Sequence, residues 1–293
     1  MNNLKKSFVG VITFICILFV LTNGVILLTI INLPRIIPSK RFKIFLGGIS
    51  NSIGSKIVEL ITGSLQALHG LQWEFDLPEH LDTQTWYLAM SNHQSWADIF
   101  ILLAAGHKKM PLLKFFMKKE LKWIPIIYLV HKTIDMPFLN RHSKKQIQKN
   151  PALKKLDYEN AEKAAKRFSR NPSTAFSFAE GTRFTDEKHS AQGSPYLNFL
   201  TPRIGALAIA LKGMPQVNEL VDFTVVYSSN KRSTWNFLCG EMNHARVKAI
   251  AYKIPRSLKD KTFEQEEEYR AEFKNFVEDI WQKKQERFAK LEF

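Results

Sequence analysis

The sequence predicts an α/β fold: a single layered domain, with a mixed central sheet flanked by helices, preceded by an N-terminal membrane helix or re-entrant helical pair. Two observations support this prediction. Strand-like runs alternate with helical runs through the middle of the chain, as in layered α/β sheets. Residues 8–33 carry no charge, and these 26 residues at about 1.5 Å each are long enough to cross the ~30 Å hydrocarbon core of a bilayer. A chain of 293 residues with 45% hydrophobic content can also bury a substantial core.

The uncharged segment 8–33 fits a retained membrane segment better than a signal peptide, because neither a shorter apolar core nor a small-residue cleavage site is evident. Basic residues flank it on both sides, so the charges predict no orientation. Asn23 and Gly24 offer a point at which it could bend into a re-entrant pair. Residues 42–71 have apolar residues at helical spacing, which fits an interfacial helix and a helix packed on the domain equally well. We therefore expect residues 1–70 to anchor the chain.

The soluble part is expected to contain one α/β domain, residues 71–256, and a C-terminal amphipathic helix docked on it, residues 257–293. Alternating or continuous apolar runs bounded by turn residues predict the strands. These strands are expected at residues 71–75, 86–91, 174–179, 221–227 and 245–254, and helices at residues 96–106 and 158–169.

Lysines are threaded through large apolar residues in segment 110–130. This mixture favours an interfacial helix whose lysines reach lipid phosphates, or alternatively a half-buried core helix, and Pro125 should break it. Residues 136–141 then predict a short strand or turn, and residues 142–155 a polar, basic linker.

The formal charge of +15 is concentrated in one segment, because residues 107–155 contain 13 Lys and Arg against two acids. Both nucleic acid and anionic phospholipid would suit such a segment, and the apolar N-terminus favours a membrane surface over nucleic acid. The two cysteines, Cys16 and Cys239, provide neither a metal-binding spacing nor a disulfide framework.

An imidazole and a carboxylate lie five residues apart in segment 91–98, SNHQSWAD. In one continuous helix, His93 and Asp98 would point about 140° apart. If the strand instead ends at Asn92 and Ser95 caps a new helix, the His93 ring can fold back from the turn onto Asp98. Such a pair would be a general base oriented by a carboxylate. The alternative is a turn histidine beside an ordinary N-terminal helix charge.

A second polar turn, EGTR at residues 180–183, follows the strand predicted at residues 174–179. A glycine turn that presents an arginine is suited to phosphate, because a guanidinium group binds phosphate oxygens in a bidentate manner. A surface turn with an incidental ion pair is the simpler alternative.

Six segments stand in a fixed order along the chain: Asn92-His93-x4-Asp98, Phe138-x-x-Arg141, Phe178-x-Glu180-Gly181-Thr182-Arg183, Phe184-Thr185, Leu200-Thr201-Pro202-Arg203 and Asp222–Tyr227. Taken together and in this order, they resemble the glycerolipid acyltransferase family of the 1-acylglycerol-3-phosphate acyltransferase type. The resemblance covers about residues 85–230 and is closest to the lysocardiolipin-acyltransferase-like branch and its bacterial membrane relatives. Two positions depart from the family pattern: Asp135 stands where a glycine is usual and Ala179 where a proline is usual.

The resemblance implies transfer of a fatty acyl group from acyl-CoA or acyl carrier protein to the free hydroxyl of a lysophospholipid, without a covalent intermediate. The acceptor would be lysophosphatidic acid or a lysophosphatidylglycerol- or lysocardiolipin-like lipid. His93 would be the base and Asp98 its partner. Beyond the acyl donor it implies no cofactor, metal or nucleic acid, and it places the catalytic domain on the cytoplasmic face of a membrane, the inner membrane in a bacterium. The acceptor-binding residues would be Arg141, Glu180, Gly181, Thr182 and Arg183.

The chemistry agrees with these roles. An alcohol attacks a thioester well only if a base removes its proton as the bond forms, whereas a thiolate leaves without strong acid help. Backbone N–H groups of Ser95 and Trp96 are candidate donors to the oxyanion, and a nucleophilic Ser91 or Ser95 is a rival mechanism. Two rival functions are a lysophospholipase that uses the same cleft and a non-catalytic, membrane-tethered protein that binds anionic lipid.

Overall fold

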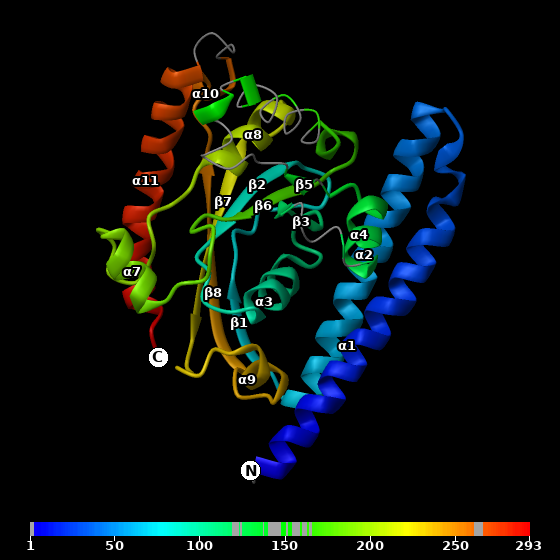
Figure 1. The fold of residues 1–293 in the computed structure, drawn as a ribbon, viewed down its shortest axis with the longest axis vertical. Helices are drawn as coiled ribbons and strands as arrows, with labels where there is room; N and C mark the ends of the chain where they lie inside the picture. The colour runs from blue at the N-terminus through cyan, green and yellow to red at the C-terminus, as the bar shows by residue number, and fades with distance from the viewer. Residues whose placement is uncertain are drawn as a thin grey trace.

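A mixed six-stranded sheet forms the centre of the part of the chain that the structure describes (Figure 1). The structure is a computed structural model that describes residues 3–118, 123, 125–136, 138–139, 148–150, 152–153, 159, 163, 166–260 and 266–293. In spatial order the strands are β1 (Gln72–Asp76), β8 (His244–Lys253), β7 (Glu219–Tyr227), β2 (Tyr87–Ser91), β6 (Thr174–Phe178) and β3 (Leu113–Phe115). The four strands from β7 to β3 are parallel, β8 is antiparallel to β7, and β1 is parallel to β8, which confirms the predicted mixed sheet.

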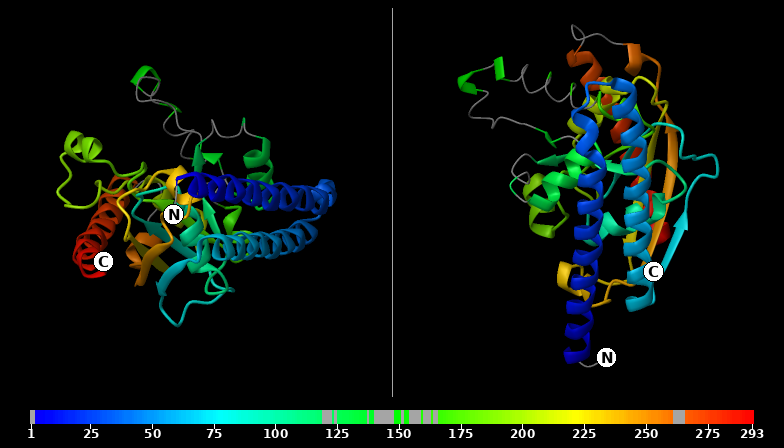
Figure 2. Two further views of the ribbon diagram at one scale, coloured as in Figure 1. Left: turned by 90° about the horizontal axis from the view of Figure 1, so that it is seen from below. Right: turned by 90° about the vertical axis from the view of Figure 1, so that its right-hand side faces the viewer.

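Side chains alternate between the two faces of the sheet and build a core on each. On β2, Leu88 and Met90 face one core, which also includes side chains of α8 (Gly205–Gly213) and α11 (Glu266–Leu291). Tyr87 and Ala89 face the other core, which includes α3 (Ala97–Gly106) and residues of α1 (Asn3–Asn32) and α2 (Lys40–His69). Figure 2 shows the α1–α2 pair and α11 on opposite sides of the sheet.

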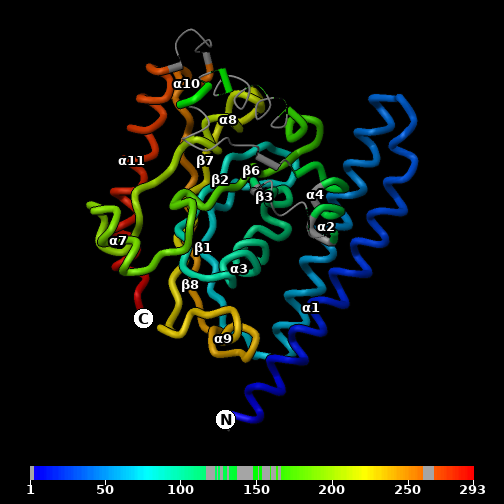
Figure 3. Tube along the Cα trace, viewed as in Figure 1, coloured from blue at the N-terminus to red at the C-terminus, as the bar shows by residue number. Residues whose placement is uncertain are grey.

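The two predicted N-terminal helices form an antiparallel pair joined by the 3₁₀ turn η1 (Leu33–Ile36), visible as a long hairpin in Figure 3. Of the two alternatives for segment 8–33, the bend at Asn23 and Gly24 is wrong, because α1 is continuous there and the Asn23 amide donates to the carbonyl of Phe19. Gly24 instead allows close packing, since a Cβ at this position would clash with Ile57 of α2. Both helices are long and apolar enough to cross a membrane by length and composition.

The helix expected over residues 110–130, with a break at Pro125, is wrong for residues 113–118. The segment contains β3, the short strand β4 (Met117–Lys118), which pairs with β5 (Phe138–Leu139), and helix α4 (Pro125–Thr133). Pro125 begins α4 instead of ending a helix, because the first helical turn needs no N–H from that residue. Lys114 does not reach outward: it is 3% exposed, and burial lowers the pKa of its ammonium group to about 8.

The residues expected to form a C-terminal amphipathic helix contain α10 (Ser257–Asp260) and α11. Tyr269, Phe273, Ile280 and Trp281 of its predicted apolar face are all buried against the sheet. Most of the expected linker 142–155 and helix 158–169 lies outside the described residues; η3 (Phe168–Arg170) is described just after them. The division at residues 70 and 256 stays a prediction, because residues of α1, α2 and α11 contribute to the two cores.

Candidate active site

The two predicted polar turns meet because β2 and β6 are parallel neighbours in the sheet. Parallel strands end at the same edge, so the turns after Ser91 and after Phe178 lie side by side. The N–H of Ala179 donates to the carbonyl of Ser91 at 3.2 Å, which continues the pairing one residue beyond the strands. A proline at position 179, usual in the family that the motifs resemble, has no N–H and could not make this bond.

The ring of His93 folds back onto Asp98 as the spacing predicted. Nδ1 of His93 lies 2.8 Å from Oδ2 of Asp98, which is fully buried in the first turn of α3. The same oxygen accepts the backbone N–H groups of Gln94 at 2.7 Å and Ser95 at 3.0 Å. Trp96, and not Ser95 as predicted, stands at the N-cap of α3, while the Ser95 hydroxyl accepts the N–H of Ala97 at 3.2 Å. With a carboxylate on Nδ1, the neutral ring holds its proton there and leaves a lone pair on Nε2.

Three further residues support this pair and were not assigned a role from the sequence. Phe178 stacks on the His93 ring, with centroids 3.8 Å apart and planes 13° apart, and so fixes the ring plane. Asn92 exchanges two hydrogen bonds of 2.9 Å with the backbone of Val225 in β7. The hydroxyl of Tyr227 donates to Oδ1 of Asp98 at 2.5 Å. The signal in the sequence was present, because all three stand in the segments that carry the family resemblance.

The buried side chain of Glu180 connects the EGTR turn to the His93 turn. Its side chain is fully buried, its Oε1 accepts the N–H of His93 at 2.7 Å, and its Oε2 accepts the N–H of Leu200 at 2.8 Å. Burial raises the pKa of this carboxyl to about 7, while the two backbone N–H groups act in the opposite direction. Without exposed surface the carboxyl is not available to an acceptor, so we propose that Glu180 positions the His93 turn.

The remaining residues of the EGTR turn have separate tasks. Gly181 adopts a φ of +68°, and a Cβ there would lie 2.8 Å from the Arg203 side chain. The Lys188 ammonium donates to the Thr182 hydroxyl at 3.0 Å and to the Arg183 carbonyl at 2.8 Å, which fixes the turn. The Arg183 side chain is exposed, and its guanidinium lies 5.8 Å from the centre of the Trp96 ring. Arg183 is therefore the EGTR side chain available to a substrate beside His93.

Arg141, which was also predicted to bind the acceptor lipid, lies outside the described residues. The departure from glycine at Asp135 nearby has a structural explanation. Asp135 adopts a φ of +57°, the left-handed region that glycine occupies readily and that aspartate tolerates better than most residues. Its carboxylate also accepts two hydrogen bonds, of 3.1 and 3.2 Å, from the guanidinium of Arg35 beside α1.

Two expectations about the serines change. The Ser95 N–H donates to Asp98, so its proposed role as an oxyanion donor is wrong, and the Trp96 amide remains the candidate of the two. Neither serine hydroxyl is placed as a nucleophile, because both residues are fully buried: Ser91 donates to Asn92 and Ser95 to the carbonyl of Arg232. Among the described residues no group of three or more His, Cys, Asp and Glu could hold a metal.

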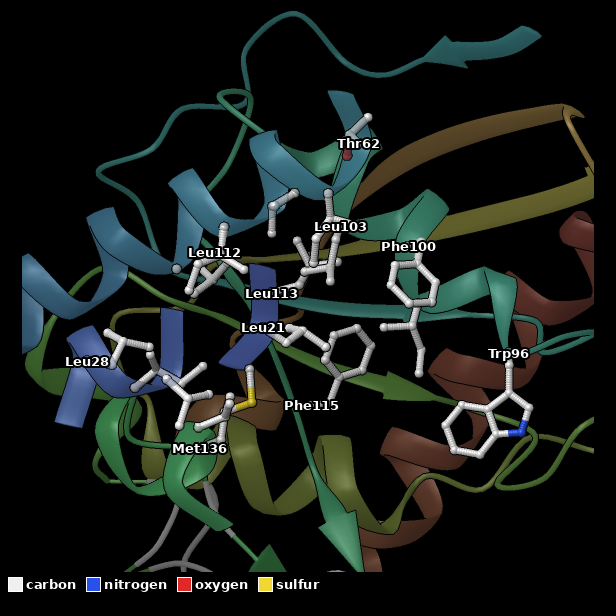
Figure 4. Close-up of a pocket in the computed structure, with 18 of the residues that line it drawn as sticks. Leu21, Leu28, Thr62, Trp96, Phe100, Leu103, Leu112, Leu113, Phe115 and Met136 are labelled. Atoms are coloured by element: carbon white, nitrogen blue, oxygen red, sulfur yellow. The ribbon is translucent and has the colours of Figure 1, made fainter. Parts of the chain in front are cut away.

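An apolar cavity of about 450 Å³ opens beside the His93 ring. Figure 4 shows Trp96 at one end of it and Leu28 and Met136 at the other. The described lining is apolar except for His93, Thr62 and the indole N–H of Trp96. The lining comes from α1, α2, α3, β3, α4 and the end of β6. The cavity thus connects the His93 ring to both N-terminal helices.

The sequence of residues 72–228 matches the family model described as Acyltransferase. Since the match spans 157 of the 293 residues, the chain belongs to the acyltransferase family and is an acyltransferase enzyme, which confirms at that level the resemblance that its motifs showed. Among solved structures, the chain is similar to the 1-acyl-sn-glycerophosphate (LPA) acyltransferase PlsC from Thermotoga maritima. That similarity has 16% sequence identity, a TM-score of 0.47 and a coverage of 95% of this chain and 95% of that chain. No curated protein matches the sequence.

Proposed function

We propose that this acyltransferase moves a fatty acyl group from acyl-CoA or acyl carrier protein to the free hydroxyl of a lysophospholipid. The observation that carries the proposal is the arrangement of three features at one place. His93, which is bonded to Asp98, lines an apolar cavity of about 450 Å³, and the exposed Arg183 lies over Trp96 in the same lining. A base, an apolar site and a cation together suit a substrate with a hydroxyl, an acyl chain and a phosphate.

In the proposed reaction, Nε2 of His93 removes the proton of the acceptor hydroxyl as its oxygen attacks the thioester carbonyl carbon. The carbon–sulfur bond then breaks, the thiolate leaves, and the imidazolium returns its proton to the thiolate or to solvent. Asp98 holds the ring and stabilises the imidazolium. The burial of Ser91 and Ser95 supports direct transfer without an acyl-enzyme.

The cavity is proposed to hold an acyl chain. Its size falls within the ~300–1,000 Å³ usual for small-molecule sites, and its lining offers few polar partners. Because α1 and α2 contribute Leu21, Val25, Ile57 and Ile61, the proposed chain site forms only when the helix pair is docked on the domain.

The outer face of α1 is proposed to lie in the membrane. The helix packs against α4 and α9 (Thr234–Leu238) of the domain, which favours insertion into one leaflet over a crossing. We further propose that the domain faces the cytoplasm and that basic side chains hold it on anionic lipid, at about 1 kcal/mol per Lys or Arg near the surface. The exposed apolar residues of α1 include Phe8, Phe14, Ile15, Phe19, Ile26 and Ile30.

The proposed acceptor is lysophosphatidic acid or a lysophosphatidylglycerol- or lysocardiolipin-like lipid. Arg183 would bind its phosphate, with Arg141 as a second contact. A panel of lysolipids assayed with labelled acyl-CoA and acyl carrier protein, in membranes that contain the protein, tests this proposal. We expect label in the phospholipid that acylation of the added lysolipid produces. Free fatty acid as the main product would indicate a lysophospholipase, and vesicle binding without turnover would indicate a lipid-binding protein.

Replacing Arg183 with alanine should raise the apparent KM for the lysophospholipid by about 10- to 100-fold, because hydrogen bonds to charged groups contribute about 1.5–3 kcal/mol. The KM for the acyl donor should change little. Steady-state kinetics with each substrate varied in turn give the comparison. Arg256→Ala is the matched control, since this exposed arginine lies in a separate pocket with Tyr87 and Glu219, the first residues of β2 and β7. An effect confined to the donor KM would contradict the role of Arg183.

Replacing Leu28 with tryptophan should reduce transfer of long acyl chains at least several-fold more than transfer of short ones. Leu28 is 1% exposed and lines the end of the cavity opposite Trp96 in Figure 4, so a larger side chain shortens the space. Ile30→Trp, on the same helix but 58% exposed, is the control and should leave the chain-length preference unchanged. Competition between donors of different length measures the preference. An unchanged preference in Leu28→Trp would rule out this cavity as the chain site.

A further inference from the structure

Tyr227 lies at the end of the strand next to the His93 turn, although no role in the reaction has been assigned to it. Strand β7 is parallel to β2 and pairs with it directly, so Tyr227 reaches the same edge of the sheet as His93. The alternation of side chains turns Tyr227 toward the core that contains α3. Its side chain is 3% exposed, and its hydroxyl donates to Oδ1 of Asp98 at 2.5 Å.

The two oxygens of Asp98 have unequal surroundings. Oδ2 is bonded to Nδ1 of His93 and to the N–H groups of Gln94 and Ser95. For Oδ1, the Tyr227 hydroxyl is the single donor within the described part of the chain. Since Asp98 is fully buried, water cannot replace that donor easily.

Asn92 holds the His93 turn and the end of β7 in a fixed relative position. Its amide group both donates to and accepts from the backbone of Val225, two residues before Tyr227. These two bonds fix the end of β2 against β7 beyond the last paired residues, Ser91 and Phe223. The His93 turn and the Tyr227 ring are therefore held on one framework.

We propose that Tyr227 is a positioning residue of the catalytic pair: its hydroxyl fixes the Asp98 carboxylate and shares its negative charge, so that Asp98 orients His93 without holding the imidazolium proton too tightly. This inference rests on the proposed function of His93 as the base. Burial raises the pKa of the Tyr227 hydroxyl well above its ordinary value, and the neighbouring Asp98 adds to this effect, so the hydroxyl keeps its proton and stays a donor.

Removing the Tyr227 hydroxyl should shift the pH dependence of the rate in a predictable direction. A carboxylate with one donor fewer keeps more negative charge near His93 and stabilises the imidazolium more strongly. His93 then stays protonated to a higher pH, and the acidic limb of the rate profile moves to higher pH. Other charged groups act on this site and are unchanged in the variant. Arg232 interacts with both Tyr227 and Asp98, and the Glu180 carboxyl interacts with Asp98.

The test compares the full-length Tyr227→Phe protein with the wild type in the same membranes over a range of pH. We expect kcat to fall about 10-fold at neutral pH and KM for both substrates to stay the same. The midpoint of the acidic limb of the kcat profile should move to higher pH by about half to one pH unit. Tyr87→Phe is the matched control. Its hydroxyl is also buried and accepts the N–H of Asp82, but it belongs to the first residue of β2, at the opposite end of the strand. The control should show no shift of the limb.

Two further measurements separate the possible outcomes. In an Asp98→Asn background, Tyr227→Phe should cause no further loss, whereas losses that multiply would overturn action through Asp98. If Tyr227→Phe fails to fold, incorporation of difluorotyrosine at position 227 keeps the shape and strengthens the donor, and the limb should move to lower pH; an unmoved limb overturns the inference.

Turnover that survives His93→Ala would refute the proposed function itself. An inactive His93→Ala together with an unmoved limb in Tyr227→Phe would refute the role of Tyr227 alone.

Discussion

Replacement of His93 with alanine should lower acyl transfer by about 10²- to 10⁴-fold, the usual contribution of a general base. The fold should survive this change. The N–H of His93 donates to Glu180 and its carbonyl accepts the N–H of Phe184 at 2.8 Å, and alanine keeps both bonds. The loss is then chemical, because Nε2 is the atom that would receive the proton of the acceptor.

Initial rates with a labelled acyl donor, at saturating lysophospholipid, measure the loss in His93→Ala. Thermal unfolding and flotation with vesicles should match the wild type. His80→Ala is a suitable control, since His80 lies in the separate pocket beside the first residues of β2 and β7, and its side chain is 58% exposed. Wild-type turnover in purified His93→Ala protein would exclude His93 as the base, whatever the family of the chain.

The part of this site that could be predicted from the sequence is the part fixed by neighbouring residues. The contact between His93 and Asp98 could be predicted as one of two alternatives, because a strand end, a short turn and the first helical turn keep the two residues close. The contacts of Glu180 with His93 and of Tyr227 with Asp98 join residues 87 and 129 positions apart. These depend on β2 lying between β6 and β7, and the order of strands in a sheet is not a local property of the sequence.

The misassigned segment 110–130 illustrates a different limit. The sequence around Lys114 fits a helix with basic and apolar positions, yet Leu113–Phe115 forms the edge strand β3 beside β6. A short apolar run cannot be assigned to a strand or a helix from its periodicity alone. The position of Lys114 next to Asp135 and Arg35, whose charges act on its ammonium group, is created by segments far apart in the chain.

A buried ionic cluster between β7 and α11, formed by Asp222, Lys284 and Arg287, should contribute strongly to stability. Asp222 is fully buried, and its two oxygens accept the ammonium of Lys284 at 2.7 Å and the guanidinium of Arg287 at 2.8 Å. The alternation along β7 directs Asp222 toward α11 and away from the His93 face. Burial lowers the pKa of the Lys284 ammonium to about 8, and the Asp222 carboxylate is the main group that opposes this effect.

Asp222→Ala should therefore lower the free energy of unfolding by about 3–5 kcal/mol, because it leaves two buried cations without their counter-charge. For a chain of this size the midpoint of thermal unfolding should fall by roughly 6 to 20 °C. Unfolding in detergent, followed by circular dichroism, measures the shift. Asp76→Ala is the control: Asp76 pairs with Lys248 at the same 2.7 Å, but its side chain is 68% exposed, so its loss should have little effect.

Replacing all three charged residues with apolar ones, as in Asp222→Leu, Lys284→Met and Arg287→Met together, should recover much of the stability lost in Asp222→Ala, because no charge then remains buried. The same helix also reaches the site. The Trp281 indole donates to the carbonyl of Leu200 at 3.1 Å, and the N–H of Leu200 donates to Glu180. A triple variant that regains stability but not turnover would mean that the ionic cluster places α11, and through Leu200 the Glu180 turn, more accurately than apolar packing does. Equal midpoints for Asp222→Ala and Asp76→Ala would contradict the stabilising role of the cluster.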